Sequence, residues 1–364
     1  MSLSITRQSL PINRRSVRLR SSALGLMLAC AVVTTGCESN PIEPDLVVRE
    51  LGVVLTSTDV ALTIFDVDDP GVTRTVGLGP DGSPVTLATR GVLAAVPLGT
   101  VSAVAVVDLE QALLLRTTAL PSGSGATGVA FVNDSIALVA NSSLGTVSPV
   151  NVLSGQALSE IEVGAFPQGV IAVDGLAYVI NANLVNFAPE GPSSLTVIDG
   201  ATLRVVDEIS LSGENAAAAA LGPNGLLYVL QSGTWGMADG SISVVNLSTW
   251  TEIDHISGFG NFPGSVAVDG QSHVYIGVFG LGMMVWDALT ESFVRGPDKA
   301  VEPGGVASTS GIAHDSQGRT YTLTPDCQDP AAAHRLAADD SAELSIPVGI
   351  CPFAISFTEI EGTS

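Results

Sequence analysis

The feature that most constrains the fold is a repeat of about 44 residues that starts at Leu51 and continues almost to the C-terminus. Short apolar segments rich in β-branched residues recur 40 to 50 residues apart. They begin at Leu51, Gly91, Ser135, Gly175, Gly225, Ser272 and Gly318. Each repeat has room for four such segments. Four strands at this period are typical of a β-propeller blade.

The segment that follows each of these usually ends on Asp or Asn. The residues are Asp66, Asp108, Asn151, Asp199, Asn246 and Asp287. An Asp or Asn side chain can accept a hydrogen bond from the backbone two residues further on, which suits a tight turn. We therefore expect a turn between the third and fourth strands of these blades.

The count of segments predicts how the ring closes. Small apolar segments, such as Pro84–Leu87 and Gly264–Ala267, suit innermost strands that crowd around an axis. The first repeat, Leu51–Leu78, lacks such a segment, whereas Pro352–Phe357 is left over at the C-terminus. We predict an all-β, seven-bladed β-propeller over residues 51–360, with four antiparallel strands per blade and the C-terminal strand closing the first blade.

Blades three to five also carry a sequence resemblance. Tyr178-Val179-Ile180-Asn181 resembles the YVTN motif, with Ile180 in place of Thr, and Leu138–Asn141 is a weaker copy. Ser194–Asp199 and Arg204–Val206 are similar to the two strands that follow in YVTN-type propeller repeats. The resemblance implies the propeller fold. It also implies an exported bacterial protein of the surface or periplasm, since most members are of that kind.

The first 36 residues read as a signal peptide. A basic run, Arg14–Arg20, precedes the apolar run Ala23–Val33, which is too short to span a bilayer comfortably. Thr34–Cys37 resembles the lipobox of bacterial lipoproteins, with Thr34 where Leu is usual. The resemblance implies a lipid on Cys37. The alternatives are an ordinary secretory cleavage near Gly36 and an uncleaved anchor helix.

The expected domain order is a signal peptide (1–36), a lipid-anchored tether (37–50) and the propeller (51–360). The expected location is the bacterial cell envelope, at the outer membrane or cell surface, or else the periplasm. With 14 Lys and Arg against 36 Asp and Glu, the formal charge is −22. Such a chain repels phosphate, so we expect no nucleic-acid partner. A hydrophobic content of 46% excludes a disordered chain.

Two enlarged loops point to a binding face. In a propeller, the loops after the second strands and those between blades lie on one face. Asn183–Ser193 and Gly233–Gly240 are long loops of this kind. The large side chains on these loops and on the between-blade loops are Phe187, Trp235, Met237, Phe166, Phe262 and Asn261. We expect Phe187, Trp235 and Met237 to lie beside one another at the rim. We expect an aromatic groove for a protein or glycan partner, with Trp235 as anchor. Alternatively, Phe166 and Phe262 only plug the channel mouth.

Catalytic chemistry has little support in the sequence. The four histidines, His255, His273, His314 and His334, show no metal-ligand spacing, and no nucleophile motif is recognisable. We assign no catalytic residue, metal or cofactor. The leading interpretation is a non-catalytic binding or scaffold protein. The alternative is a periplasmic enzyme of the lactonase or lyase kind, with a metal or His314 at the channel mouth.

The cysteines predict one disulfide. Cys30 lies in the signal peptide and Cys37 at the proposed lipid site. Cys327 and Cys351 remain, as an even pair in an oxidising compartment. We expect these two to be bonded and to fasten the closing strand.

Overall fold

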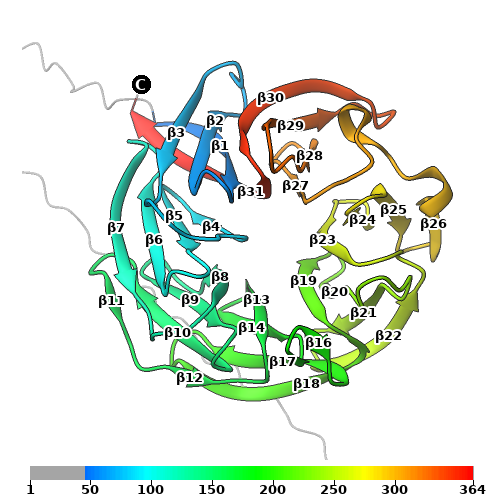
Figure 1. Cartoon of the computed structure of the whole chain (residues 1–364), viewed down its shortest axis with the longest axis horizontal. Helices are drawn as coiled ribbons and strands as arrows, with labels where there is room; N and C mark the ends of the chain where they lie inside the picture. The colour runs from blue at the N-terminus through cyan, green and yellow to red at the C-terminus, as the bar shows by residue number, and fades with distance from the viewer. Residues whose placement is uncertain (1–45, 364) are drawn as a thin grey trace, which may run out of the picture. The chain divides into compact units, whose positions relative to one another are not determined.

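The computed structural model describes residues 46–363. In that range the chain forms seven antiparallel sheets arranged as the blades of a ring, as predicted (Figure 1). Six of them have four strands, and in blade three two short strands share the outermost position. In each blade the strands follow one another from the axis outward. Blade one holds β31 (Pro352–Thr363), β1 (Leu46–Thr56), β2 (Ala61–Asp66) and β3 (Thr73–Gly77). Blade two holds β4 (Ala88–Arg90), β5 (Leu93–Pro97), β6 (Ala103–Asp108) and β7 (Leu113–Ala119).

The middle blades each follow the same order. Blade three holds β8 (Ala126–Phe131), β9 (Ile136–Asn141) and β10 (Thr146–Asn151), with β11 (Gln156–Ala157) and β12 (Ile161–Glu162) both paired to β10. Blade four holds β13 (Pro167–Val173), β14 (Leu176–Asn181), β17 (Pro192–Asp199) and β18 (Arg204–Glu214). A small hairpin, β15 (Leu184–Val185) and β16 (Ala188–Pro189), rises between β14 and β17.

The last three blades complete the ring. Blade five holds β19 (Ala216–Leu221), β20 (Leu226–Gln231), β21 (Ser241–Asn246) and β22 (Thr251–Ser257). Blade six holds β23 (Pro263–Val268), β24 (His273–Val278), β25 (Gly282–Asp287) and β26 (Ser292–Arg295). Blade seven holds β27 (Gly311–His314), β28 (Thr320–Thr324), β29 (Pro330–Leu336) and β30 (Ala342–Ile350). Two 3-10 turns, η1 (Pro297–Lys299) and η2 (Pro303–Gly305), lie between blades six and seven.

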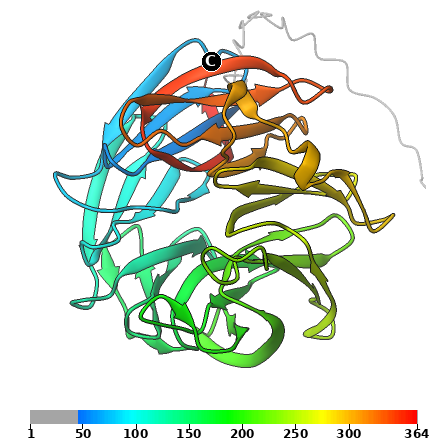
Figure 2. The same cartoon turned by 45° about the vertical axis from the view of Figure 1, so that its right-hand side comes forward.

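The C-terminal strand closes the first blade, as the sequence predicted. β31 pairs with β1 from Leu46 opposite Thr363 to Thr56 opposite Pro352. Figures 1 and 2 both show red β31 among the blue strands of the N-terminus. β1 begins at Leu46, so it includes residues 46–50 of the segment that sequence analysis assigned to the tether.

The connections define two faces of the ring. The loops between second and third strands and the connections between blades form what we call the loop face. The turns between first and second strands and between third and fourth strands form the opposite, turn face. Because β1 is the second strand of its blade, Thr56 lies toward the loop face and Leu46 toward the turn face.

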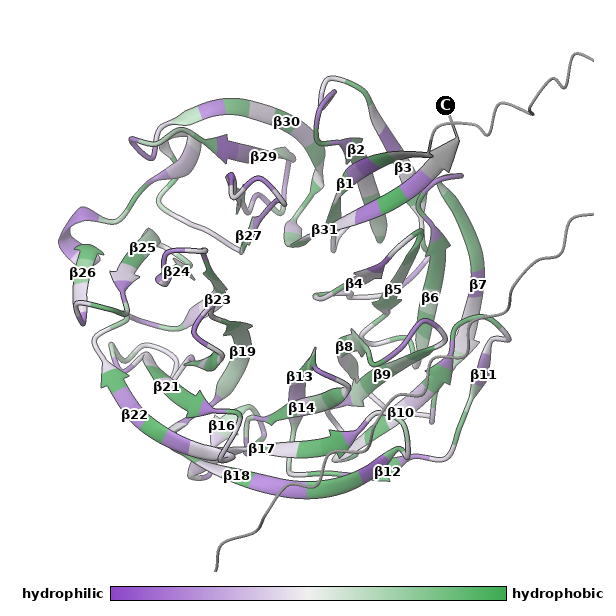
Figure 3. Cartoon of the chain, turned by 180° about the vertical axis from the view of Figure 1, so that it is seen from behind, coloured by the Kyte–Doolittle hydropathy of each residue, from purple (hydrophilic) through white to green (hydrophobic). Residues whose placement is uncertain are grey.

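The interior is built from the second and third strands of each blade. β5, β6, β20 and β21 are buried along nearly their whole length, because both faces of each sheet pack against neighbouring blades. The outermost strands alternate, as in the C-terminal half of β18, where every second residue is buried. Figure 3 shows this as alternating hydrophilic and hydrophobic bands along the rim. Among the described residues, no helix is long and apolar enough to cross a membrane.

The predicted Asx turns are all present. The side-chain Oδ1 atoms of the six Asp and Asn residues accept hydrogen bonds from backbone N–H groups two or three residues ahead. The donors are Asp68, Gln111, Leu153, Ala201, Ser248 and Leu289. At Asp199, hydrogen bonds from the backbone and side chain of Thr202 lower the pKa of the carboxyl group. These turns are therefore fixed by local hydrogen bonds.

One inner strand differs from its prediction. Pro84–Leu87 is not a strand, and blade two begins its ladder only at β4. Pro84 has no N–H to donate to a ladder. Thr86 in this segment instead donates its hydroxyl proton to the carbonyl oxygen of Thr127 in blade three. The segment therefore reaches the axis as an irregular chain.

Five blades share a left-handed residue immediately before the inner strand. These residues, with φ between +52° and +60°, are Gly125, Phe166, Asn215, Phe262 and Cys351. A register shift follows at the start of each of these inner strands. The chain thus turns sharply from the loop face into the axis at one repeated position, which glycine would occupy without strain.

The expected disulfide joins Cys327 to Cys351. Cys327 lies in the connection between β28 and β29, and Cys351 precedes β31. The backbone N–H of Cys351 donates to the carbonyl oxygen of Asp326 at 2.5 Å, and its carbonyl accepts from the N–H of Ser57 at 2.9 Å. The disulfide and the hydrogen bond to Asp326 therefore fasten the closing strand to blade seven, and the hydrogen bond from Ser57 fastens it to blade one.

Candidate functional site

A cavity of about 580 Å³ opens along the axis on the loop face. All seven blades contribute to it, because the first residues of every inner segment converge there. Small residues such as Ala217, Gly264 and Gly311 line the wall and leave the space open. A concave, mostly apolar pocket with a few polar groups is the usual form of a ligand site.

Trp235 and Phe262 form one side of the cavity mouth. Their ring centroids are 4.9 Å apart in an edge-to-face arrangement, although Trp235 remains 69% exposed. The backbone N–H of Gly236 donates to Oδ1 of Asn261 at 3.1 Å, which ties the blade-five loop to the connection before blade six. The Asp239 carboxylate accepts from the N–H of Thr234 and holds the same loop closed. These hydrogen bonds therefore hold Trp235 in a fixed position against Phe262.

A second aromatic pair lies on blade four. Phe187, 82% exposed at the tip of the β15–β16 hairpin, stacks edge-to-face on Phe166 with centroids 5.6 Å apart. Met237 is exposed beside Trp235 in the sequence. Sequence analysis expected Phe187, Trp235 and Met237 side by side. Instead, each long-loop aromatic pairs with a between-blade Phe, and no ring pair in residues 46–363 joins Phe187 to Trp235.

Two further aromatics at the mouth were not anticipated. Phe279 follows β24 and is 65% exposed, and Phe353 lies at the start of β31. Both line the axial cavity together with Trp235 and Phe262. Phe279 could have been found from its place after the second strand of blade six, the position that made Trp235 a candidate. Phe166 and Phe187 are not among the lining residues.

Hydroxyl groups on the cavity wall link neighbouring blades. Thr127 donates to the carbonyl oxygen of Pro167 at 3.2 Å, and Ser232 donates to that of Pro263 at 2.7 Å. Ser310 likewise donates to the carbonyl oxygen of Pro352 at 2.6 Å. Thr86 makes the equivalent bond to Thr127. Each hydroxyl group donates its proton to a carbonyl oxygen of the next blade, so its own oxygen can still accept hydrogen bonds.

A carboxamide pair crosses the wall between blades four and five. Nε2 of Gln168 donates to Oδ1 of Asn215 at 2.9 Å, and Nδ2 of Asn215 donates to the carbonyl oxygen of Gly233. These bonds orient Gln168, and its Oε1 accepts no hydrogen bond from residues 46–363. The wall therefore presents fixed oxygen acceptors.

His314 lies at the opposite end of its inner strand, toward the turn face. Its ring contacts Tyr275 edge-to-face at 4.9 Å, and Nδ1 is 3.2 Å from Oγ1 of Thr320. Burial lowers the pKa of His314 and, together with the Asp269 carboxylate, raises the pKa of Tyr275 to about 12. His314 does not line the axial cavity. Within residues 46–363, no group of three His, Cys, Asp or Glu side chains could hold a metal ion.

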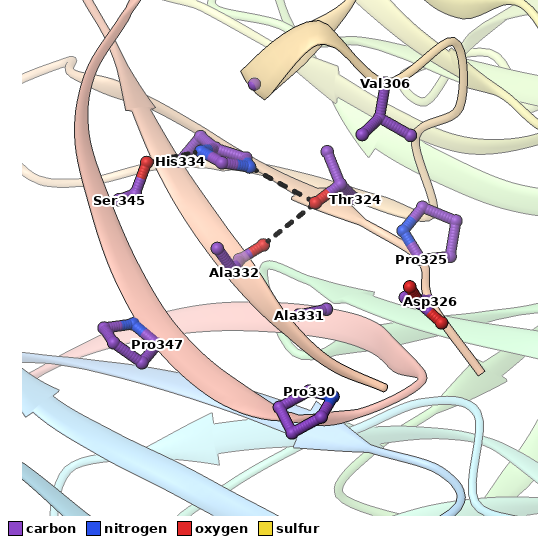
Figure 4. A pocket seen from close by; sticks show the side chains of 11 residues that line it. Val306, Thr324, Pro325, Asp326, Pro330, Ala331, Ala332, His334, Ser345 and Pro347 are labelled. Carbon is purple, nitrogen blue, oxygen red and sulfur yellow. Dashed lines mark hydrogen bonds between the residues drawn. The ribbon is translucent and has the colours of Figure 1, made fainter. Parts of the chain in front are cut away.

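A smaller hollow of about 390 Å³ lies on blade seven (Figure 4). His334 borders it, with Nδ1 2.9 Å from Oγ of Ser345 and Nε2 3.2 Å from Oγ1 of Thr324. Burial lowers the pKa of His334. The one acidic residue that lines the hollow is Asp326. Its carboxylate accepts backbone hydrogen bonds from Gln328 and Asp329, which lower the pKa of the carboxyl group. These polar groups are thus occupied with partners in their own blade.

Comparison with solved structures supports the fold. Hydrazine synthase from Kuenenia stuttgartiensis is similar over 78% of this chain and 97% of that chain, with a TM-score of 0.62 and 14% identity. A functionally unknown protein from Desulfotomaculum acetoxidans is similar over 84% of this chain and 98% of that chain, with a TM-score of 0.63 and 13% identity. No family model and no curated protein matches the sequence. At these identities the likeness concerns the propeller fold alone.

Proposed function

We propose that this chain is a non-catalytic binding protein that holds its ligand in the axial cavity of the loop face. The observation that supports this most is the Trp235–Phe262 pair, a largely exposed indole fixed at the mouth of a cavity to which all seven blades contribute. Long loops are expensive to order and add little to the core, so such loops are commonly functional. Tryptophan is also enriched among residues that dominate binding energy.

We also propose that the protein is exported and anchored by a lipid on Cys37, with a propeller of the YVTN type. The lipobox-like segment and the signal peptide lie outside the described residues, so the support is the sequence. Within the described residues, the chain enters the ring at Leu46, toward the turn face.

The binding proposal is tested by affinity capture. Purified protein is immobilised and exposed to detergent-solubilised envelope material from the source cells. Trp235→Ala should lose the captured ligand while its thermal midpoint stays within a few degrees of wild type. Leu289→Ala is the matched control, because Leu289 is 72% exposed on a turn-face loop. Equal capture by all three proteins would overturn the proposal.

The anchor is tested by metabolic labelling with palmitate. Wild-type protein should incorporate the label and fractionate with membranes, whereas Cys37→Ser should do neither. Equal labelling of both proteins would show that Cys37 is not the lipid site.

A further inference from the structure

The axial cavity carries no formal charge. None of its lining residues is Asp, Glu, Lys, Arg or His, although the chain as a whole has 36 acidic and 14 basic residues. An ionic group that entered this space would lose its hydration and find no counter-ion, which is strongly unfavourable. The ligand of this cavity is therefore an uncharged molecule, or an uncharged end of a larger one.

The polar groups of the wall are uncharged and include both acceptors and donors. The hydroxyl protons of Thr86, Thr127, Ser232 and Ser310 are donated to carbonyl oxygens of neighbouring blades, which leaves their oxygen atoms as acceptors. Gln168 adds a carboxamide oxygen and a second amide proton, since only one proton is donated to Asn215. The hydroxyl groups of Ser265 and Thr309, which also line the cavity, have no hydrogen-bond partner within residues 46–363. A wall of this kind matches a ligand whose groups both donate and accept hydrogen bonds.

This mixed polar surface distinguishes between two neutral ligand classes. A peptide brings N–H groups that only donate and carbonyl groups that only accept. A saccharide carries several hydroxyl groups, each of which can donate its proton and accept another on the same oxygen. Because the wall offers both acceptors and donors, such hydroxyl groups can find partners on it, which favours a polyol over a peptide.

The mouth supplies the complementary apolar contact. Trp235, Phe262, Phe279 and Phe353 line it, and the rings of Trp235 and Phe279 are mostly exposed. The C–H faces of a pyranose ring are apolar, and an aromatic face can cover them without requiring a hydrogen bond. Aromatic rings at the mouth and acceptors below them match the two kinds of surface on one sugar chain.

We propose that the axial cavity binds the end of an uncharged oligosaccharide, with its C–H faces on Trp235 and its hydroxyl groups donating to the wall. This inference rests on the proposed binding function, because it names the ligand class of the same cavity. The inter-blade hydrogen bonds make the acceptors rigid before the ligand arrives, so little order remains to be imposed on binding.

The test measures direct binding of defined sugars by titration calorimetry and tryptophan fluorescence. The neutral probes are cellotriose, maltotriose and tri-N-acetylchitotriose, and the charged probe is trigalacturonic acid. At least one neutral probe should bind saturably, and the charged probe should bind at least tenfold more weakly. Trp235→Ala and Thr127→Val should each weaken binding of that neutral probe by about five- to tenfold.

Two controls separate binding from folding. Thr127→Ser keeps the hydroxyl group and should recover most of the affinity that Thr127→Val loses, and Leu289→Ala should be unaffected. If no neutral probe binds at millimolar concentration while affinity capture still depends on Trp235, the saccharide assignment is wrong and the binding function stands. If affinity capture also does not depend on Trp235, both proposals fail. Equal affinity for the charged probe would likewise overturn the saccharide assignment.

Discussion

Phe262 and Gly125 occupy the same position in blades six and three, each immediately before an inner strand, with φ of +56° and +58°. A glycine adopts this left-handed conformation freely, whereas a residue with a Cβ pays about 1–2 kcal/mol. Blade six therefore keeps a strained aromatic where glycine would serve the turn. The ring lines the axial cavity and packs against Trp235.

Phe262→Gly should separate stability from binding. The substitution relieves the left-handed strain but removes a ring contact worth about 0.5–1.5 kcal/mol, so the free energy of unfolding should stay within about 1 kcal/mol of wild type. Capture of the cavity ligand should fall sharply. Phe166→Gly is the matched control, with the same backbone position and a ring outside the cavity lining. Loss of capture in both variants would contradict a role specific to Phe262.

Gly52→Ala should destabilise the closing blade. Gly52 lies opposite Phe65 on β2 and Phe357 on β31, and a Cβ at this position would collide with the ring of Phe65, which is fully buried. Displacing a packed ring typically costs about 1–3 kcal/mol. The measurement is urea unfolding. Gly77→Ala, where nothing lies within 4 Å of the added carbon, should be neutral. Equal stability of the two variants would argue against this packing.

Reduction of the Cys327–Cys351 disulfide should weaken the seam where the chain ends meet. The bond spans 24 residues, for which loop-closure entropy gives about 3 kcal/mol of stabilisation. Dithiothreitol should lower the midpoint of denaturant unfolding in wild type. The double variant Cys327→Ser/Cys351→Ser should have the lower midpoint already and should not respond further. A response of the double variant to dithiothreitol would assign the effect to another group.

Much of this fold can be read from the sequence because each blade is a local unit. The 44-residue period follows from one four-stranded meander per repeat, and the Asx residues at Asp66 and its equivalents fix turns through contacts of two or three residues. The closing strand is predictable from a count alone. The exception, Pro84–Leu87, reflects a proline whose missing N–H outweighs the apolar pattern.

The cavity is less predictable because it depends on convergence from all blades. Val85 and Ile355 line the same space although they are far apart in the sequence. Phe353 reaches the mouth from the start of the closing strand, and Phe279 reaches it from the position after the second strand of blade six. The polar wall depends on hydroxyl groups that donate to the next blade, as Ser232 does to Pro263, a residue 31 positions away. Such contacts have no local signature in the sequence.

The last prediction concerns acid stability. Burial lowers the pKa of His314 and His334 from the ordinary value of 6.5, and at His314 it outweighs the opposing effect of the Asp269 and Asp315 carboxylates. The folded protein therefore binds fewer protons than the unfolded chain just below pH 6.5. The free energy of unfolding should hold above about pH 6.5 and fall as the pH drops below that value. His314→Asn removes one of these groups, so urea unfolding should show a shallower fall, by up to about 1.4 kcal/mol per pH unit. Its absolute stability at neutral pH is not diagnostic, because Asn also loses the contact with Tyr275. A slope equal to that of wild type would show that His314 is not buried as a neutral imidazole.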